Sequence, residues 1–489
     1  MKIVFAFCLL ISSAFAANRP NIVFLFADDQ RPDTIGAHGN EYIQTPHLDR
    51  LAANGLSFTR NYCAGSYSGA VCVASRSMLM TGRYWHRIKD TRNWEGLTTL
   101  PERLGENGYR TFAVGKWHNG LKTLARSFQS GKNIYMGGMS DHTKVPLQEL
   151  KPDGSLTEKE LGTRFSSTHF ADAAIEFIHD QSGDQPYMLY VAFTAPHDPR
   201  NPPPSYRKLY YENRPPLPEN FLPDHPFDNG HVSGKKRDEG LSTHPREHDV
   251  ISDQLCEYYG LITHLDSQVG RILDAIESSE ERDNTIVIYT ADHGLAMGSH
   301  GLLGKQNVYE HSMGSPLIIS GPGVPQGEET DAMTYILDLH KTIYSLCEVD
   351  IPSDIDGQDL STLFENPDAS VRDSIFLPFQ DIMRAVRNDR FKLHKYPKIN
   401  HTLLFDLIDD PNEMNNLVEH PSYAGIVKQL TALMQDWQKR VGDPSPLSVD
   451  NPGPKEVDFS KIERSLDVWQ PDWIREKYFG GRSEADHGN

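Results

Sequence analysis

Four apolar runs of strand length, each followed at once by polar residues, constrain the fold of this chain more than any other feature. The runs are residues 21–27, 109–114, 187–193 and 285–290. Helical patterns lie between them, at about residues 99–108, 168–180 and 253–278. Strands that alternate with helices indicate a largely parallel sheet, and continuous apolar runs indicate strands buried on both faces. We therefore expect an α/β fold with helices flanking the sheet.

The polar residues that follow these runs should meet at one edge of the sheet. Ligands bind beyond the carboxyl ends of the strands in open α/β sheets. The polar residues are Asp28 and Asp29, Lys116 and His118, His197 and Asp198, and Asp292 and His293. Neighbouring strand residues point to opposite faces, so Asp28 and Asp29 can share one site only where the strand ends. An Asp-rich turn is the alternative interpretation of this pair.

The stretch from Ser66 to Arg83 is the strongest candidate for the reacting group. It contains Cys72 and Arg76, and a short helix is predicted over residues 75–80, ended by Gly82. A helix N-terminus favours an anion, and Arg76 adds a fixed charge and a forked donor for an oxyanion. A cysteine alone is more often a small buried hydrophobic residue, so the surrounding pattern has to decide.

The pattern Cys-Val-Ala-Ser-Arg at 72–76, followed by Thr-Gly-Arg at 81–83, resembles the signature of the type I sulfatases. In that family the motif is Cys (or Ser)-x-Pro-x-Arg, and its first residue is converted after translation to formylglycine. Here Ala74 stands where proline is usual. The resemblance covers about residues 20–417. It implies the alkaline phosphatase-like fold, with a large mixed sheet and a smaller C-terminal α+β subdomain, and it implies a sulfuric ester hydrolase.

The resemblance also assigns roles to individual residues. It implies one divalent cation, with Ca²⁺ expected before Mg²⁺, bound by Asp28, Asp29, Cys72, Asp292 and His293. Carboxylate oxygens suit such a cation, whereas imidazole nitrogen is a less favoured ligand of Ca²⁺. It further implies six catalytic residues: Cys72, Arg76, Lys116, His118, His197 and Lys305.

The implied mechanism has two stages. Hydrated formylglycine at position 72 attacks the sulfur, while Arg76, Lys116, Lys305 and the metal hold the sulfuryl oxygens. His197 protonates the leaving oxygen of the sugar, and His118 then takes a proton from residue 72 so that sulfate is eliminated.

A sulfated polysaccharide or oligosaccharide is the expected substrate, because the chain carries an export signal and a long proline-rich segment at 199–245. Four residues are candidates for sugar contacts, although each could equally be an ordinary loop residue: Asp141, His142, Asp198 and Arg200. Two alternatives stay open. One is a phosphomonoester or phosphonate hydrolase of the same superfamily, and the other is a carbohydrate-binding protein with a catalytically dead site.

Residues 1–16 are typical of a secretory signal peptide, since Lys2 precedes an apolar run that ends in Ala-Phe-Ala. No run is long enough to span a bilayer, so we expect an exported protein, periplasmic or secreted, without a transmembrane segment. The formal charge of −19 at pH 7 argues against a nucleic acid partner. The expected partners are the sulfated carbohydrate and a formylglycine-generating maturation enzyme.

At 489 residues the chain exceeds one typical domain, and its C-terminal part has a different pattern. Short β-like runs at 383–386, 390–394 and 402–405 precede an amphipathic helix at about 423–440. We therefore divide the chain into a signal peptide (1–16), a catalytic domain (17–369) and a C-terminal subdomain (370–489) with a small sheet, a helix and a tail.

Overall fold

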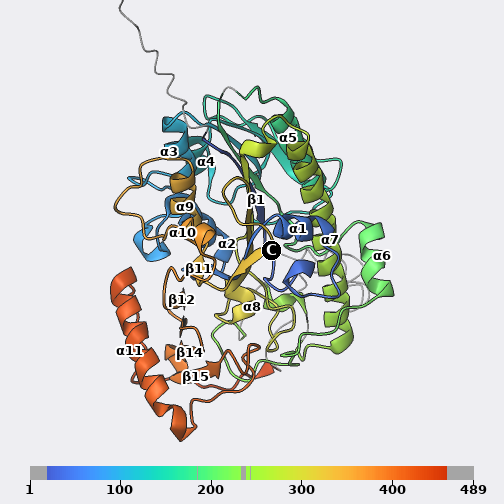
Figure 1. Cartoon of the computed structure of the whole chain (residues 1–489). Helices are drawn as coiled ribbons and strands as arrows, with labels where there is room; N and C mark the ends of the chain where they lie inside the picture. The colour runs from blue at the N-terminus through green and yellow to red at the C-terminus, as the bar shows by residue number, and fades with distance from the viewer. Residues whose placement is uncertain (1–18, 184, 233–237, 243, 460–489) are drawn as a thin grey trace, which may run out of the picture.

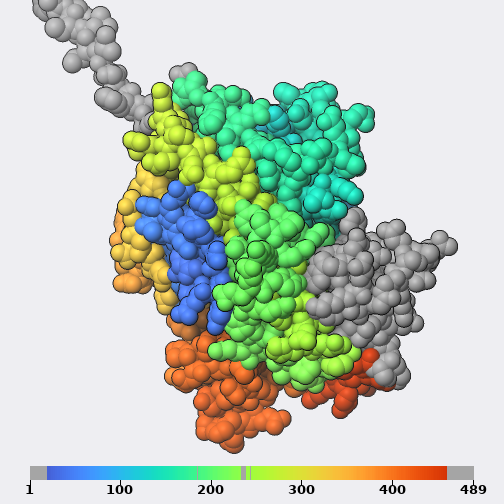
Figure 2. Space-filling model, turned by 90° about the vertical axis from the view of Figure 1, so that its right-hand side faces the viewer, coloured from blue at the N-terminus to red at the C-terminus, as the bar shows by residue number. Residues whose placement is uncertain are grey.

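The computed structural model describes residues 19–183, 185–232, 238–242 and 244–459. The predicted signal peptide and residues 460–489 of the predicted tail lie outside these ranges. Among the described helices, none combines the length and the apolar character needed to cross a bilayer. A large sheet domain makes up most of the molecule, and a smaller C-terminal unit, orange to red, forms its lower end (Figures 1 and 2).

A large mixed sheet forms the centre of the molecule, with strand order β10-β2-β9-β8-β1-β7-β3-β4-β5-β6 and with β11 paired to β2. The strands are β1 (Asn21–Ala27), β2 (Gly55–Tyr62), β3 (Arg110–Lys116), β4 (Ser130–Tyr135), β5 (Pro146–Leu150), β6 (Glu160–Leu161), β7 (Tyr187–Ala192), β8 (Thr285–Ala291), β9 (Gly314–Ser320), β10 (Glu328–Thr330) and β11 (Thr334–Tyr335). The central strands β8, β1, β7, β3 and β4 are parallel, and antiparallel pairs flank them. The predicted mostly parallel mixed sheet is confirmed.

Strand β1 shows why the strand sequences are apolar throughout. Its alternate residues enter two different cores: Ile22, Phe24 and Phe26 on one face, and Val23, Leu25 and Ala27 on the other. The second face is covered by α1 (Pro46–Ala53), α5 (Ser166–His179) and α7 (His248–Glu277), and the first by α2 (Val71–Thr81), α3 (Leu100–Glu106), α4 (Leu121–Ser127) and α9 (Asp338–Leu346) (Figure 1). Further helices are α6 (Pro204–Glu212), α8 (Glu310–Met313) and α10 (Thr362–Glu365). Single 3-10 turns lie at Gly36–His38, Trp85–Arg87, Glu239–Leu241, Arg282–Asn284, Pro397–Ile399 and Pro421–Tyr423.

The predicted helices are present. The largest difference between prediction and structure is the first residue of helix α2. Helix α3 starts with a capping box, in which Thr99 and Glu102 exchange hydrogen bonds. Helix α2 ends at Gly82, as predicted, with that glycine in the left-handed conformation, but the helix begins at Val71 rather than at Ser75. Every residue of α2 is buried. A helix with no exposed face has no amphipathic period, so the sequence pattern could not mark where it starts.

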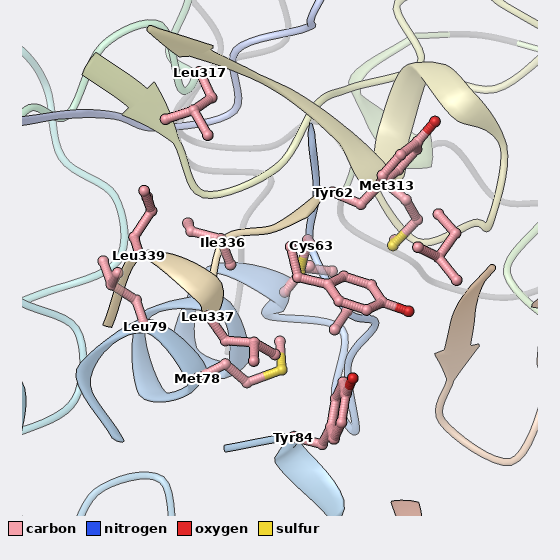
Figure 3. Close-up of a cluster of buried hydrophobic side chains, with 14 of the residues drawn as sticks. Tyr62, Cys63, Met78, Leu79, Tyr84, Met313, Leu317, Ile336, Leu337 and Leu339 are labelled. Atoms are coloured by element: carbon pink, nitrogen blue, oxygen red, sulfur yellow. The ribbon is translucent and has the colours of Figure 1, made fainter. Parts of the chain in front are cut away.

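Helix α2 is held inside a buried cluster that joins several segments (Figure 3). Met78 of α2 lies with Cys63, Met313 and Leu337, which follow β2, end α8 and precede α9. Burying an apolar side chain of this size stabilises the fold by about 1.5–3 kcal/mol. This packing gives the N-terminus of α2 a rigid position at the edge of the sheet.

The C-terminal unit contains an antiparallel sheet of β12 (Ile375–Phe379), β13 (Met383–Arg387), β14 (Phe391–Tyr396) and β15 (His401–Asp406), in that order. Helix α11 (Ala424–Val441) packs across β13 and β14. The predicted small sheet and helix are confirmed, and β12 is an additional strand. The boundary at residues 369 and 370 stays a prediction.

A buried ion pair fastens the end of α11 to this small sheet. Arg384 of β13, fully buried, donates through Nε and Nη2 to the two carboxylate oxygens of Asp443 at 2.8 and 2.9 Å. Removing one partner of such a pair leaves an uncompensated buried charge. We expect Asp443→Ala to lower the free energy of unfolding by roughly 3 kcal/mol, measured by urea denaturation.

The matched control for this prediction is Asp436→Ala on the same helix. Asp436 pairs with Lys439, and both side chains are more than two-thirds exposed. We expect a change of less than about 0.5 kcal/mol, because exposed ion pairs contribute little. Equal losses for the two variants would show that the buried pair does not stabilise the subdomain.

Candidate active site

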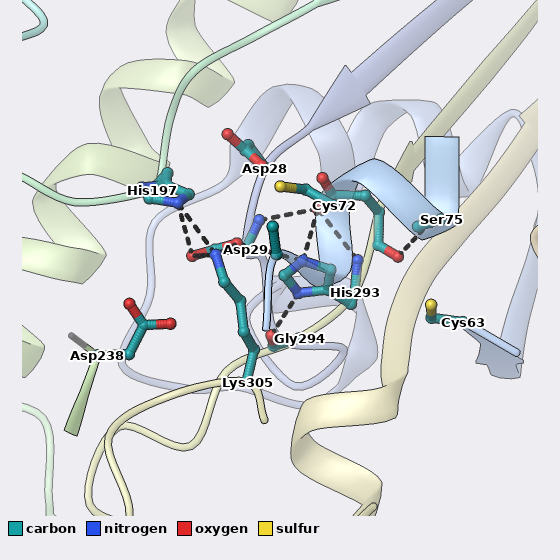
Figure 4. A network of polar contacts seen from close by, with 12 residues as sticks. Asp28, Asp29, Cys63, Cys72, Ser75, His197, Asp238, His293, Gly294 and Lys305 are labelled. Carbon is teal, nitrogen blue, oxygen red and sulfur yellow. Dashed lines mark hydrogen bonds and ion pairs between the residues drawn. The ribbon is translucent and has the colours of Figure 1, made fainter. Parts of the chain in front are cut away.

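The carboxyl ends of β1, β3, β7 and β8 bring the predicted polar residues to one place (Figure 4). The backbone N–H of Asp29 donates to Asp292 Oδ1 at 3.1 Å, which links the ends of β1 and β8. Lys116 donates from Nζ to Asp28, which links β3 to β1. The parallel sheet therefore assembles the site from four distant parts of the sequence.

The end of β1 turns both neighbouring aspartates toward the site. Asp29 has a φ of 66°, in the left-handed region that residues other than glycine rarely adopt. Tyr258 of α7 donates from its hydroxyl to the Asp29 carbonyl oxygen at 2.6 Å and so holds this turn. Asp28 and Asp29 are 0% and 1% exposed. Strand β1 therefore ends at this pair, as a site shared by Asp28 and Asp29 requires.

Cys72 is the second residue of α2, so it lies in the first helical turn rather than before the helix. Its Sγ atom is 3.1 Å from His118 Nδ1. Burial alone would raise the pKa of the thiol, but the charge of Lys116 and the contact with His118 outweigh this effect and hold that pKa well below its ordinary value. Asn119 donates to the Val73 carbonyl at 3.0 Å and fixes the helix against the loop that carries His118.

The end of β3, where Gly115 precedes Lys116, carries that lysine into the site. The pairing of β3 with β4 shifts register between Val114 and Gly115, and Gly115 has a φ of 88°. A Cβ at this position would overlap the carbonyl oxygen of Ala192 on β7. Only glycine satisfies both conditions, and the next residue, Lys116, is fully buried against Asp28.

Arg76 is a permanent buried cation beneath the site. Its Nη2 is 3.2 Å from Asp292 Oδ2 and 3.5 Å from Asp28 Oδ1. The guanidinium lies 4.7 Å from the centre of the Phe26 ring. Burial opposes its charge, but Tyr190, Asp292 and Asp28 together raise the pKa above its ordinary value.

Lys305 and His197 form a contact on the far side of Asp29 (Figure 4). Lys305 donates to both carboxylate oxygens of Asp29 at 2.7 and 2.8 Å, and its Nζ is 3.0 Å from His197 Nε2. His197 Nδ1 donates to the Asp198 carbonyl at 2.9 Å, which leaves Nε2 toward Lys305. Burial, aided by the charges of Lys305 and Lys116, lowers the pKa of His197 to about 3.

The acidic residues fit a divalent cation. Potential ligand atoms of Asp28, Cys72 and Asp292 lie within 4.8 Å of one another, and so do those of Asp29, Asp292 and His293. Within the described chain, Asp28 Oδ1 and His293 Nε2 are buried without a hydrogen bond. Burial would lower the pKa of His293, but Asp292 and Asp29 raise it to about 9, which shows the excess of negative charge at this point. A buried carboxylate oxygen that makes no hydrogen bond is what a hard cation would satisfy.

A cavity of about 380 Å³ opens onto these residues and is lined by Cys72, His118, His197 and Lys305. Four further polar residues in its wall were missed by the sequence interpretation: His231, Asp238, Gln306 and Gln380. His231 and Asp238 belong to the segment 199–245, and Gln380 follows β12. Gln306 could have been predicted, because it follows the predicted catalytic residue Lys305 in the sequence. The other three carry no local pattern.

The four candidate sugar contacts have other surroundings, and none of them lines the cavity. His142 contacts Ser166 and Thr194 through Nδ1 and the His197 carbonyl through Nε2, so it supports the loop that carries His197. Asp198 lies against His197 Nδ1. Arg200 is buried against Gln254, and Asp141 binds Thr143 in a local turn. Atoms of Asp141, His142 and Arg200 are occupied by these contacts, and the sugar contacts expected of all four residues stay predictions.

The sequence matches family models and known proteins along most of its length. The family model described as Sulfatase matches residues 20–349, and the model described as N-sulphoglucosamine sulphohydrolase, C-terminal, matches residues 298–440. An N-acetylglucosamine-6-O-sulfatase of Bacteroides thetaiotaomicron is 27% identical, over 92% of this chain and 90% of its own. An arylsulfatase of Clostridium perfringens is 26% identical, over 85% of this chain and 94% of its own.

Solved structures show the same fold. A protein in complex with its substrate D-glucosamine-2-N,6-O-disulfate has a TM-score of 0.73 at 24% identity, and the match covers 88% of this chain and 99% of that one. Since the Sulfatase model spans well over half of the sequence, including all the strands that end in the site, the chain belongs to the sulfatase family of hydrolases.

Proposed function

We propose that this sulfatase is exported and hydrolyses sulfate esters of a sulfated polysaccharide or oligosaccharide, with formylglycine at position 72 and a divalent cation, Ca²⁺ before Mg²⁺. One observation carries the proposal: Cys72 lies between carboxylates that can hold a cation and a histidine 3.1 Å away, on the wall of a cavity. When bound, the cation supplies Lewis-acid charge to a sulfuryl oxygen. Formylglycine supplies a hydroxyl nucleophile that a thiol does not.

Lys305 in the cavity wall, with Arg76 and Lys116 buried near Cys72, suits a sulfate group. Arg76 and Lys116 are fully buried, and Lys305 is 3% exposed, so their charges act where water is excluded. They attract an anion locally, against the net charge of −19 of the whole chain. In this role they hold the sulfuryl oxygens and keep the sulfur facing residue 72.

The two histidines lie where proton transfer is needed. His118 Nδ1 is next to the side chain of residue 72 and can accept a proton from it. His197 lines the cavity, and Lys305 Nζ is within 3.0 Å of its Nε2. A bound sulfuryl group would add negative charge beside His197 and favour its protonated form, which the leaving oxygen requires. We therefore assign His118 as the base and His197 as the acid.

A sugar substrate is supported by the cavity and by the relatives. A volume of about 380 Å³ accommodates one sulfated sugar residue. The relative from Bacteroides thetaiotaomicron is named for N-acetylglucosamine 6-O-sulfate, and the sulfatase fold of this chain is shared with a protein that binds a sulfated glucosamine.

The function is tested by measuring sulfate release from a panel of sulfated mono- and oligosaccharides and from p-nitrophenyl sulfate, beside phosphate release from p-nitrophenyl phosphate and hydrolysis of a phosphonate monoester. We expect the sulfate esters to be hydrolysed with the higher kcat/KM. A preference for phosphate or phosphonate esters would favour the other hydrolase class, and binding of sulfated sugar without any turnover would favour a dead carbohydrate-binding protein.

The aspartates should hold the cation. We expect Asp29→Ala to lose the bound divalent ion, measured by elemental mass spectrometry, and to lower kcat by roughly 100-fold or more. Asp33→Ala, in the same loop but exposed and paired with Arg31, is the control and should retain both. If Asp29 only shaped a turn, its replacement would cost about 1 kcal/mol of stability and leave turnover intact.

A further inference from the structure

Gln380 is the contribution of the C-terminal sheet to the cavity wall. It follows β12 at the turn to β13 and lines the same cavity as Cys72, His118 and His197. The turn lies against the segment that leads to α2: Ser66 donates its N–H to the Pro378 carbonyl at 3.0 Å, and Gln380 donates its N–H to the Ser66 carbonyl at 2.7 Å. A residue far from the catalytic motif in sequence is thereby fixed beside it.

The backbone at Gln380 is held in an unfavourable conformation. Its φ is 46°, in the left-handed region where glycine or asparagine is ordinarily found. The conformation is maintained from both sides, because Arg384 donates to the Gln380 carbonyl at 2.6 Å and the ring of His231 packs 5.0 Å from that of Phe379. Strained backbone of this kind persists only where surrounding contacts hold it, and it is enriched at functional sites.

The side chain of Gln380 offers an unused hydrogen-bonding group. Its backbone N–H and carbonyl are both bonded, whereas its carboxamide makes no hydrogen bond with any described residue. The side chain is half-buried. An amide that is positioned rigidly on a cavity wall and has no protein partner is available for a ligand.

The chemistry of this wall differs from that of the sulfate-binding side. Arg76, Lys116 and Lys305 are cations that suit a sulfate group, whereas Gln380 is neutral and provides both a donor and an acceptor. Asp238, also on the wall, accepts a hydrogen bond from Gln306 at 2.6 Å. Neutral amide and carboxylate groups suit hydroxyl or acetamido groups and disfavour a second anionic group.

We propose that Gln380 is a specificity residue that hydrogen-bonds a hydroxyl or acetamido group of the sugar that carries the scissile sulfate. This inference rests on the proposed function, since it names a contact to the sugar. Gln380 binds the leaving-group portion of the substrate and takes no part in bond breaking.

The test compares Gln380→Gly and Gln380→Ala on two substrates: the sugar sulfate that the wild type hydrolyses best, and p-nitrophenyl sulfate, which lacks sugar hydroxyls. We expect kcat/KM for the sugar sulfate to fall roughly 3-fold to 10-fold in both variants, as for one lost neutral hydrogen bond. Activity on p-nitrophenyl sulfate should stay within about 2-fold of wild type. The melting temperature should be unchanged or higher for Gln380→Gly, because glycine tolerates the positive φ, and it should not rise for Gln380→Ala.

Four outcomes would overturn the inference. Equal losses on both substrates would show that Gln380 acts on the sulfate or on the fold, and so would a lower melting temperature in Gln380→Gly. Unchanged kcat/KM for the sugar sulfate would show that the amide makes no contact with the sugar. If the wild-type protein hydrolyses p-nitrophenyl sulfate but no sugar sulfate, the sugar substrate of the proposed function fails first, and the contact proposed for Gln380 fails with it.

Discussion

Cys72→Ala is expected to abolish sulfate ester hydrolysis, with kcat reduced by at least roughly 10,000-fold. The reason is that residue 72 supplies the nucleophile, and the cations around it can hold a sulfuryl group but cannot attack it. The fold should survive, because the change removes a single sulfur atom from a helix that stays packed through Met78 and its neighbours. Mass spectrometry of the peptide that contains residue 72 should show the aldehyde in active wild-type protein.

The control for this variant is Cys256→Ala, which removes another buried thiol, in α7, that does not line the cavity. We expect it to keep its activity. Cys72→Ser tests the chemistry further: a serine that escapes conversion has a single hydroxyl and should be nearly inactive. Wild-type protein that is fully active with an unmodified thiol at position 72 would contradict the formylglycine assignment.

His118→Ala and His197→Ala are expected to fail at different stages. His197 is assigned as the acid for the leaving group, and general acid catalysis contributes roughly 100-fold to 10,000-fold. Its removal should therefore slow hydrolysis of a sugar sulfate strongly and hydrolysis of p-nitrophenyl sulfate only weakly, because the aryl leaving group needs little protonation. His118 contacts residue 72, so the loss of rate in His118→Ala should be similar for the sugar sulfate and for p-nitrophenyl sulfate.

Intact mass measured shortly after mixing with substrate distinguishes the two histidines. We expect His118→Ala to release the sugar once and then to carry one sulfuryl group on residue 72, because the proton acceptor that allows sulfate to leave is missing. His197→Ala should carry none, because it is slow before that point. No added mass on His118→Ala, or equal added mass on both variants, would show that the two roles are assigned wrongly even though the chain is a sulfatase.

The sheet and its functional edge could be predicted because the relevant signals are local. A strand buried on both faces is apolar throughout, as in residues 21–27, and the polar residues that follow it must lie at the strand's carboxyl end. Parallel pairing then places Asp28, Lys116, His197 and Asp292 at one edge without further information. The motif at 72–76 could likewise be recognised from contiguous residues.

Other features were decided only by packing between distant segments. Helix α2 begins at Val71 because the whole helix is buried, and a buried helix carries no amphipathic signal. His142 was predicted to contact the sugar, and the fold hydrogen-bonds both of its ring nitrogens, one to Ser166 and the other to the His197 carbonyl. No spacing in the sequence distinguishes a histidine in a cavity wall from one that supports a loop.

The sequence alone determined the fold class, the edge of the sheet that carries the site, and the acidic and basic residues gathered there, because strand polarity and a contiguous motif specify them. Only the tertiary structure decided which residues complete the cavity. Asp238 comes from a long segment with little periodicity, and Gln380 comes from a second sheet whose turn docks beside Ser66. Such contacts depend on how separate units pack against each other, and packing of that kind leaves no periodic mark in the chain.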